Sequence, residues 1–179
     1  MPPFTHRLAA AADIPAIRLL MDRSIGQLQR DFLSTAEIAA SRAVMGLDTQ
    51  LIEDGTYFLV ESGDRLAGCG GWSARATLYG GDHSQALRDP RPLDPIRDAA
   101  RIRAMFTDPD FARAGVGKLI LSLCEGAARS AGFQRAEMMA TLAGEPLYRA
   151  CGYREIERVA AAPANGTAIP LVRMGKALG

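Results

Sequence analysis

The spacing of apolar residues changes along the chain, and each change predicts a different kind of secondary structure. In the first 50 residues apolar positions recur every three or four residues, as on one face of a helix. A first helix is expected from Asp13 to about Ser24, with the Asp13 side chain capping its free N–H groups. A second helix is expected after Ser34, because Glu37 follows three residues later and completes a capping box.

After Gly55 the pattern becomes typical of strands. A β-hairpin is expected over 57–60 and 66–72, with a turn at 62–64. Arg101 to Thr107 places apolar residues at every second position, so Ile102, Ala104 and Phe106 are expected on one face of a strand. Helical spacing returns from Gly115 to Ala131. The other expected elements are a strand over 4–8, helical turns over 47–54, a strand over 136–140, a short helix over 145–150 and strands over 153–159 and 169–174.

These elements suit a single domain over residues 1–179, since a chain of this length can bury one core. Strand, turn, helix and strand over 101–140 form one βαβ unit. The stretch 79–97 is rich in glycine and proline and is expected to be a loop insertion. Two interpretations of this insertion stay open, a lid over a pocket and a flexible tether.

Composition narrows the classes of partner. Net charge is +1 with interspersed signs, and no basic run suggests a nucleic acid or a membrane as partner. Residues 1–8 lack a secretory signal pattern. Cys69, Cys124 and Cys151 are an odd number without CxxC spacing, which favours a reducing, cytoplasmic location. His6 and His83 lie far apart in sequence, so no metal site is expected.

The stretch most informative about chemistry is Arg113 to Lys118, a glycine-rich turn before a helix. The first N–H groups of a helix are unpaired and lie at the positive end of its dipole, so they can bind an anion. Glycine at 115 and 117 would let a pyrophosphate approach the backbone, with Arg113 and Lys118 adding positive charge. A turn whose glycines serve geometry alone is the alternative.

Two common phosphate-binding motifs do not fit this turn. A Walker A loop would need glycine at 112 and serine or threonine at 119, where the chain has Ala112 and Leu119. A dinucleotide fingerprint starting at Gly115 would need glycine where Ile120 stands. A nucleotide-binding regulator is therefore disfavoured.

Two segments together resemble the GNAT N-acetyltransferase superfamily. Residues 105–118 resemble its coenzyme A-binding signature, with a strand, a proline two residues later and an R-x-G-x-G turn. Residues 146–153 resemble its second signature, a tyrosine on a short helix followed by glycine and an aromatic residue. Ala112 departs from the usual Gln or Arg, and a usual Asn is missing from 141–144, where Thr141 could replace it.

The resemblance implies an α/β (α+β) fold with a mixed, mainly antiparallel twisted sheet flanked by helices. It implies acetyl-CoA as co-substrate and acetyl transfer to a primary amine of a small molecule or protein by direct attack. It also implies a bulge in the strand over 101–107, whose freed N–H groups near 105–107 would hold the pantetheine arm and polarise the thioester carbonyl. Tyr148 would be the general acid, with a packing role as the alternative. The residues implied to bind the coenzyme are Met105, Phe106, Thr107, Arg113, Ala114, Gly115, Val116, Gly117 and Lys118.

The general base and the acceptor are less defined. The strand over 101–107 has no acidic residue, which leaves Glu137, Glu145, Asp82, His83 or a water chain as candidates. The resemblance implies that regions 25–34 and 73–99 wall the acceptor pocket. Trp72 could line that pocket, although a tryptophan at the end of a hairpin strand is more often part of the core. A homodimer and a non-catalytic acyl-CoA-binding module both remain compatible with the sequence.

Overall fold

A computed structural model describes residues 3–162 and 166–179 of the chain. Its strands form one sheet in the order β1-β2-β3-β4-β5-β7-β6, and neighbours are antiparallel except for β4 and β5. The expected mixed, mainly antiparallel sheet is confirmed. The strands are β1 (Phe4–Leu8), β2 (Tyr57–Ser62), β3 (Arg65–Ser73), β4 (Ala100–Thr107), β5 (Arg135–Thr141), β6 (Arg154–Ala161) and β7 (Ile169–Ala177).

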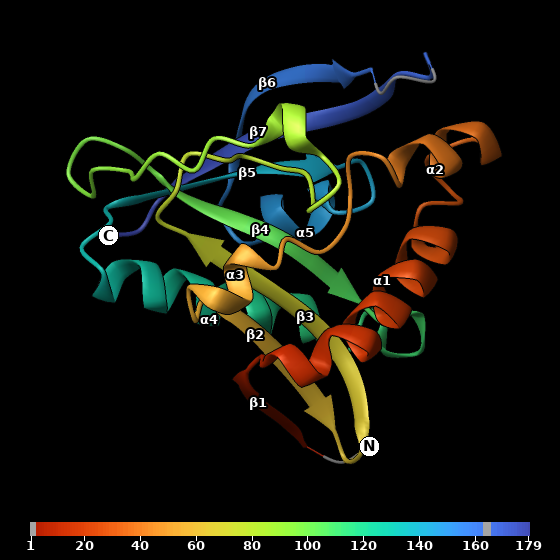
Figure 1. The fold of residues 1–179 in the computed structure, drawn as a ribbon, viewed down its shortest axis with the longest axis horizontal. Coiled ribbons are helices and arrows are strands. Elements are labelled where there is room, and N and C mark those ends of the chain that lie inside the picture. The colour runs from red at the N-terminus through yellow and green to blue at the C-terminus, as the bar shows by residue number, and fades with distance from the viewer. Residues whose placement is uncertain (1–2, 163–165) are drawn as a thin grey trace.

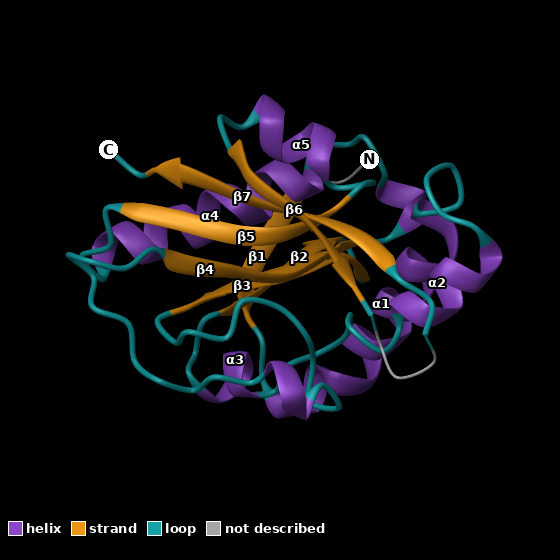
Figure 2. Cartoon of the chain, turned by 90° about the horizontal axis from the view of Figure 1, so that it is seen from above, coloured by secondary structure: helices purple, strands orange, loops and turns teal. Residues whose placement is uncertain are grey.

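Helices cover both faces of this sheet (Figures 1 and 2). The helices are α1 (Ile14–Leu28), α2 (Thr35–Ser41), α3 (Gln50–Glu53), α4 (Val116–Ser130) and α5 (Glu145–Ala150). Figure 2 shows α4 and α5 on one face and α1 and α3 on the other. Among the described residues no helix is long and apolar enough to cross a bilayer.

The helix α4 packs unusually close to the hairpin strand β3. A Cβ atom at Gly70 would lie 2.6 Å from Ile120 of α4 and 2.7 Å from the Met105 side chain of β4. Both distances are shorter than any ordinary carbon–carbon contact, so only glycine fits here. This close packing fixes the start of α4 beside the end of β4.

The bulge that the resemblance implies in β4 is confirmed, and because of it the alternation expected along this strand is wrong. Ala104 has a φ of +48°, and the β3–β4 register shifts between Cys69 and Gly71. Ile102 therefore packs in the core beneath α4, whereas Phe106 packs in the core beneath α1. A bulge adds one residue to one strand, and this reverses the side to which later residues point.

The two expected helix caps differ in outcome. Ser34 forms the expected capping box, since its hydroxyl accepts the Glu37 N–H (3.2 Å) and the Glu37 carboxylate accepts the Ser34 N–H (2.7 Å). Asp13 precedes α1, but its side chain caps no helical N–H group. Its carboxylate instead forms two 2.8 Å hydrogen bonds with Arg7, and these hold the pKa of Asp13 at about 2.

The insertion over 79–97 is fastened to the body of the protein. The Thr77 N–H donates to the Asp89 carbonyl (2.8 Å), and the Leu93 N–H donates to the Ala74 carbonyl (2.8 Å). The Ser84 hydroxyl donates to the carbonyl of Ala43, in the segment after α2 (2.9 Å). Leu93 itself is buried in the core. The insertion is thus a fixed wall, which argues against the flexible tether.

Candidate functional site

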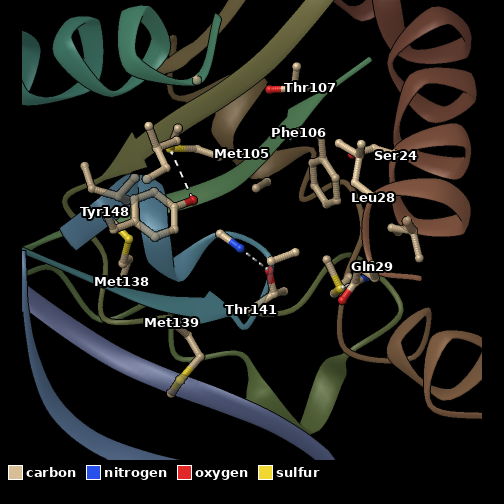
Figure 3. A pocket seen from close by; sticks show the side chains of 18 of the residues that line it. Ser24, Leu28, Gln29, Met105, Phe106, Thr107, Met138, Met139, Thr141 and Tyr148 are labelled. Atoms are coloured by element: carbon tan, nitrogen blue, oxygen red, sulfur yellow. Dashed lines mark hydrogen bonds between the residues drawn. The ribbon is translucent and has the colours of Figure 1, made fainter. Parts of the chain in front are cut away.

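The main cavity opens where β4 and β5 separate. These parallel strands pair only at Ala100 with Ala136 and at Arg101 with Glu137. Beyond that point each strand edge faces a cavity of about 950 Å³, lined on the β4 side by residues 102–107. Figure 3 shows Tyr148 and Met105 on one side of this cavity and side chains of α1 on the other. An unpaired strand edge offers backbone N–H and C=O groups to a ligand.

The start of α4 forms one end of the cavity. Gly115 has a φ of +90° and ends the turn, and the helix begins at Val116. Within the described residues, the N–H groups of Gly115 to Lys118 have no backbone hydrogen bond outside regular helix pairing. Arg113 and Lys118 are exposed beside them and form no ion pair in the described part of the chain. Free N–H groups, the helix dipole and two cations make this an anion site.

Gly117 lines the cavity and also lies close to α5. A Cβ atom there would lie 2.7 Å from the Leu147 side chain of α5. A larger residue at 117 would push the end of the Leu147 side chain aside, because α4 and α5 approach closely at the cavity wall.

Tyr148 is carried by α5 and reaches the cavity across from α1 (Figure 3). Its hydroxyl lies 3.8 Å from the Met105 sulfur, a weak acceptor that a better one could displace. Burial raises the pKa of this phenol well above its ordinary value, with smaller contributions from Cys124 and Cys151. The group therefore stays protonated, as a proton donor must.

Most residues expected at the coenzyme site lie together. Tyr148 and every expected coenzyme residue except Ala114 line the cavity. Ala114 does not, and its N–H donates to the Phe111 carbonyl within the turn (3.2 Å). Thr141 lines the cavity as well, and its hydroxyl accepts the Gly144 N–H before α5 (3.1 Å).

None of the four side chains considered as a general base lines this cavity. Glu137 is held by Arg101 (2.8 Å) and Arg173 (2.6 Å). Glu145 is partly desolvated, but hydrogen bonds from Arg149 and Arg158 lower its pKa.

The other two candidates are also engaged elsewhere. Asp82 accepts the Thr49 N–H (2.9 Å), and the His83 ring lies 2.8 Å from the Arg42 carbonyl. Both line a smaller hollow of about 340 Å³ beside α1. No cluster of potential metal ligands occurs among the described residues.

The opposite end of the cavity comes from segments that lie far apart in sequence. The region over 25–34 contributes Ile25, Leu28, Gln29, Asp31 and Phe32, and the insertion contributes Tyr79 and Gly80. Trp72 does not contribute, because it is buried against Phe133 with ring centroids 5.9 Å apart.

Sequence reasoning missed Met139 of β5 and Leu171 of β7 at this end. Both are ordinary apolar strand residues, and only the register of β5 with β7 brings them to the cavity. Leu171 pairs with Thr141, two residues beyond Met139.

Comparisons with known proteins agree with this geometry. Among protein-family models, the acetyltransferase (GNAT) domain matches residues 53–155, more than half of the chain. A search of curated protein sequences finds no match.

Solved structures share the fold over almost the whole chain. A GCN5-related N-acetyltransferase from Rhodopseudomonas palustris is 17% identical, with a TM-score of 0.71 over 99% of this chain and 96% of that chain. The protein yncA from Salmonella typhimurium, solved with acetyl-CoA, is 18% identical, with a TM-score of 0.64 over 99% and 95%. The PaiA N-acetyltransferase from Thermoplasma acidophilum, solved with coenzyme A, is 10% identical, with a TM-score of 0.64 over 98% and 99%.

Proposed function

Because the chain belongs to the GNAT acetyltransferase family, for which acetyl-CoA is the typical acetyl donor, we propose that it acetylates a primary amine by direct attack on acetyl-CoA. The observation that carries the proposal is the gap between β4 and β5, with an anion site at one end and a protonated phenol on its wall. No covalent acetyl-enzyme is required, since the amine and the thioester would meet inside one cavity.

The residues around the gap fit the parts of coenzyme A. The free N–H groups of Gly115 to Lys118, with the Arg113 and Lys118 side chains, suit the pyrophosphate. The unpaired edge of β4 over Met105 to Thr107 suits the amide-bearing arm and offers N–H groups to the thioester oxygen. Ala114 has no place in this proposal, because its N–H is already bonded.

The chemistry proposed for Tyr148 is donation of a proton to the departing sulfur. The neutral amine nitrogen attacks the thioester carbon, the C–S bond breaks, and the phenol protonates the coenzyme thiolate. Because burial raises the pKa of the phenol, the phenolate left by this donation is a strong base, and it takes a proton from the reacting nitrogen, which has become acidic on acylation. The nitrogen ends as an amide, and these steps release no net proton, because the proton that the neutral amine loses replaces the one that the thiolate gains.

The proton of an incoming ammonium group needs an acceptor, and we propose water. The four side chains first considered as a base are tied up in ion pairs or hydrogen bonds away from the cavity. A water chain through the exposed mouth beside Asp31 is the remaining path. A cytoplasmic location and a homodimer stay predictions that rest on the sequence.

The first test is calorimetric titration of the protein with acetyl-CoA and with ATP. Lys118→Glu puts a negative charge at the proposed pyrophosphate site and should weaken acetyl-CoA binding about tenfold. Arg97→Glu is the matched control, since Arg97 is highly exposed on the insertion and does not line the cavity.

Three outcomes distinguish the possible functions. Tight binding of acetyl-CoA that Lys118→Glu weakens and Arg97→Glu does not would support the coenzyme site. Binding without thiol release from any amine would indicate a non-catalytic acyl-CoA-binding module. Equal loss in both variants, or preference for ATP, would overturn the proposal.

A further inference from the structure

The two sides of the cavity carry opposite charges. Arg113 and Lys118 lie at the start of α4, on one face of the sheet. Asp31 follows α1 on the other face and is the sole acidic side chain lining the described cavity. Arg103 also lines it, but its charge is balanced by Asp48 at 3.1 Å. A charge pattern of this kind favours an anion at one end and a cation at the other.

The wall around Asp31 is mainly apolar, although Ser24 and Gln29 also line the cavity. Its apolar side chains come from five separate segments and are hydrocarbon, thioether or aromatic. They are Phe32, Met45, Leu78, Tyr79, Met139 and Leu171. Phe32 is 46% exposed, which is unusual for a large aromatic residue and is explained if a ligand covers it.

The turn after α1 holds Asp31 and Phe32 in place. The N–H groups of Phe32 and Leu33 both donate to the Gln29 carbonyl, at 3.0 and 2.9 Å. Leu33 is buried against β7 and anchors the turn. Asp31 has no ion pair or hydrogen bond to another described residue, so its carboxylate is available to a ligand.

We propose that the acceptor is a cationic amine that carries a bulky apolar group and no carboxylate near the nitrogen, and that Asp31 determines this specificity. The inference rests on the proposed function, since it names the substrate class of the same site. Asp31 attracts the ammonium group and repels a neighbouring carboxylate, and the apolar wall receives the rest of the molecule.

The reaction of this acceptor balances without further reactants. The ammonium group loses one proton to water at the mouth beside Asp31, and the free amine attacks the thioester carbon. The products are the N-acetylated amine, coenzyme A with its thiol protonated, and one proton in solution. Asp31 binds and selects, and it forms no covalent bond.

Three amine probes test separately the ammonium group, the absence of a carboxylate and the apolar group. The first is 2-phenylethylamine, which has both an ammonium and an apolar group. Phenylalanine adds a carboxylate beside the nitrogen, and ethanolamine lacks the apolar group. Affinity is measured by titrating each probe into the protein saturated with coenzyme A, which cannot donate acetyl. Thiol release with acetyl-CoA is measured in parallel.

We expect 2-phenylethylamine to bind about fivefold more tightly than phenylalanine and more than about tenfold more tightly than ethanolamine. In Asp31→Asn the preference over phenylalanine should fall close to one, and in Asp31→Lys it should reverse. Asp64→Asn is the matched control, because Asp64 is an exposed carboxylate in the β2–β3 turn and does not line the cavity. Affinity for acetyl-CoA should be the same in every variant.

The outcomes keep this inference separate from the proposed function. Equal affinity of the wild-type protein for 2-phenylethylamine and phenylalanine would overturn the acceptor class, and so would an unchanged preference in Asp31→Asn. Failure of all three probes to bind would overturn it as well. Selective binding without thiol release would leave the acceptor class standing and overturn acetyl transfer. Thiol release without selectivity among the probes would support acetyl transfer and overturn the acceptor class.

Discussion

The two ends of the cavity differ in the groups that form them: one is formed mainly by backbone groups of a single turn, the other by side chains of several segments. At the proposed coenzyme end a single stretch, Arg113 to Lys118, supplies backbone N–H groups and two cations from one turn. At the acceptor end side chains come from α1, the insertion, β5 and β7. Backbone groups recognise a constant ligand whatever the neighbouring side chains are, whereas side chains can change with the acceptor. On the proposed function, the donor and the acceptor are specified by separate parts of the chain.

The largest expected effect concerns a buried ion pair beside the acceptor end. Arg103 is buried and pairs with Asp48 (3.1 Å), while its guanidinium also donates to the Gly80 carbonyl (2.8 Å). Asp48→Asn should lower the free energy of unfolding by about 3 kcal/mol, because it leaves a buried charge without a partner. Urea unfolding measures this loss.

Asp54→Asn provides the control for that experiment. Asp54 pairs with Arg75 at 2.8 Å in a more exposed position, so its loss should cost less than about 1 kcal/mol. Acetyl-CoA affinity should persist in folded Asp48→Asn protein while the KM for amines rises. Similar destabilisation by the two substitutions would contradict the role given to the Arg103 pair.

The next effect lies where the two ends meet. Tyr148→Phe keeps the ring and its edge-to-face contact with Tyr153, but removes the proton donor. We expect kcat to fall by about a hundredfold or more, with the affinity for acetyl-CoA unchanged. Steady-state thiol release and calorimetry measure the two quantities.

The pH dependence of kcat provides a second test of the role of Tyr148. Burial raises the pKa of Tyr148, so the phenol stays protonated as pH rises through the usual range for tyrosine. Wild-type kcat should show no alkaline decline from this group below about pH 10. Full activity in Tyr148→Phe would show that the residue only packs α5.

A smaller effect tests the apolar wall of the acceptor end. Phe32→Ala removes an aromatic side chain that is 46% exposed, so folding should change little. The KM for 2-phenylethylamine should rise about fivefold, while the KM for acetyl-CoA stays constant. Leu19→Ala is the control, since Leu19 is 65% exposed on α1 and does not line the cavity. Equal changes in both variants would remove Phe32 from the acceptor site.

The smallest expected effect concerns β4, the strand that lines both the coenzyme end and the acceptor end of the cavity. Ala104 has a φ of +48°, and the Tyr57 hydroxyl donates to its carbonyl (2.8 Å). Ala104→Gly relieves the strain of this conformation and should stabilise the fold by about 0.5 kcal/mol, after the lost methyl contacts are subtracted. Thermal unfolding would detect the shift. Destabilisation by more than about 1 kcal/mol would mean that the methyl packing outweighs the strain.

Local sequence patterns predicted most of the helices and strands correctly, and they placed the turn at 113–118 directly before α4. The hairpin, the βαβ unit and the short helix over 145–150 all occur as expected, and so does the Ser34 capping box. Each depends on residues close together in sequence. The expected Asp13 cap failed because Arg7, on the neighbouring strand, competes for the same carboxylate.

The sequence by itself determined the order of the elements, the family and the turn at Arg113 to Lys118, since periodicity and turn chemistry are local properties of the chain. Only the tertiary structure located the bulge implied by the resemblance at Ala104, and with it the opposite faces that Ile102 and Phe106 occupy. It also decided that Asp31 and Met139 share a cavity. These residues lie more than a hundred positions apart, and their proximity follows from sheet register and helix packing, which no local pattern records.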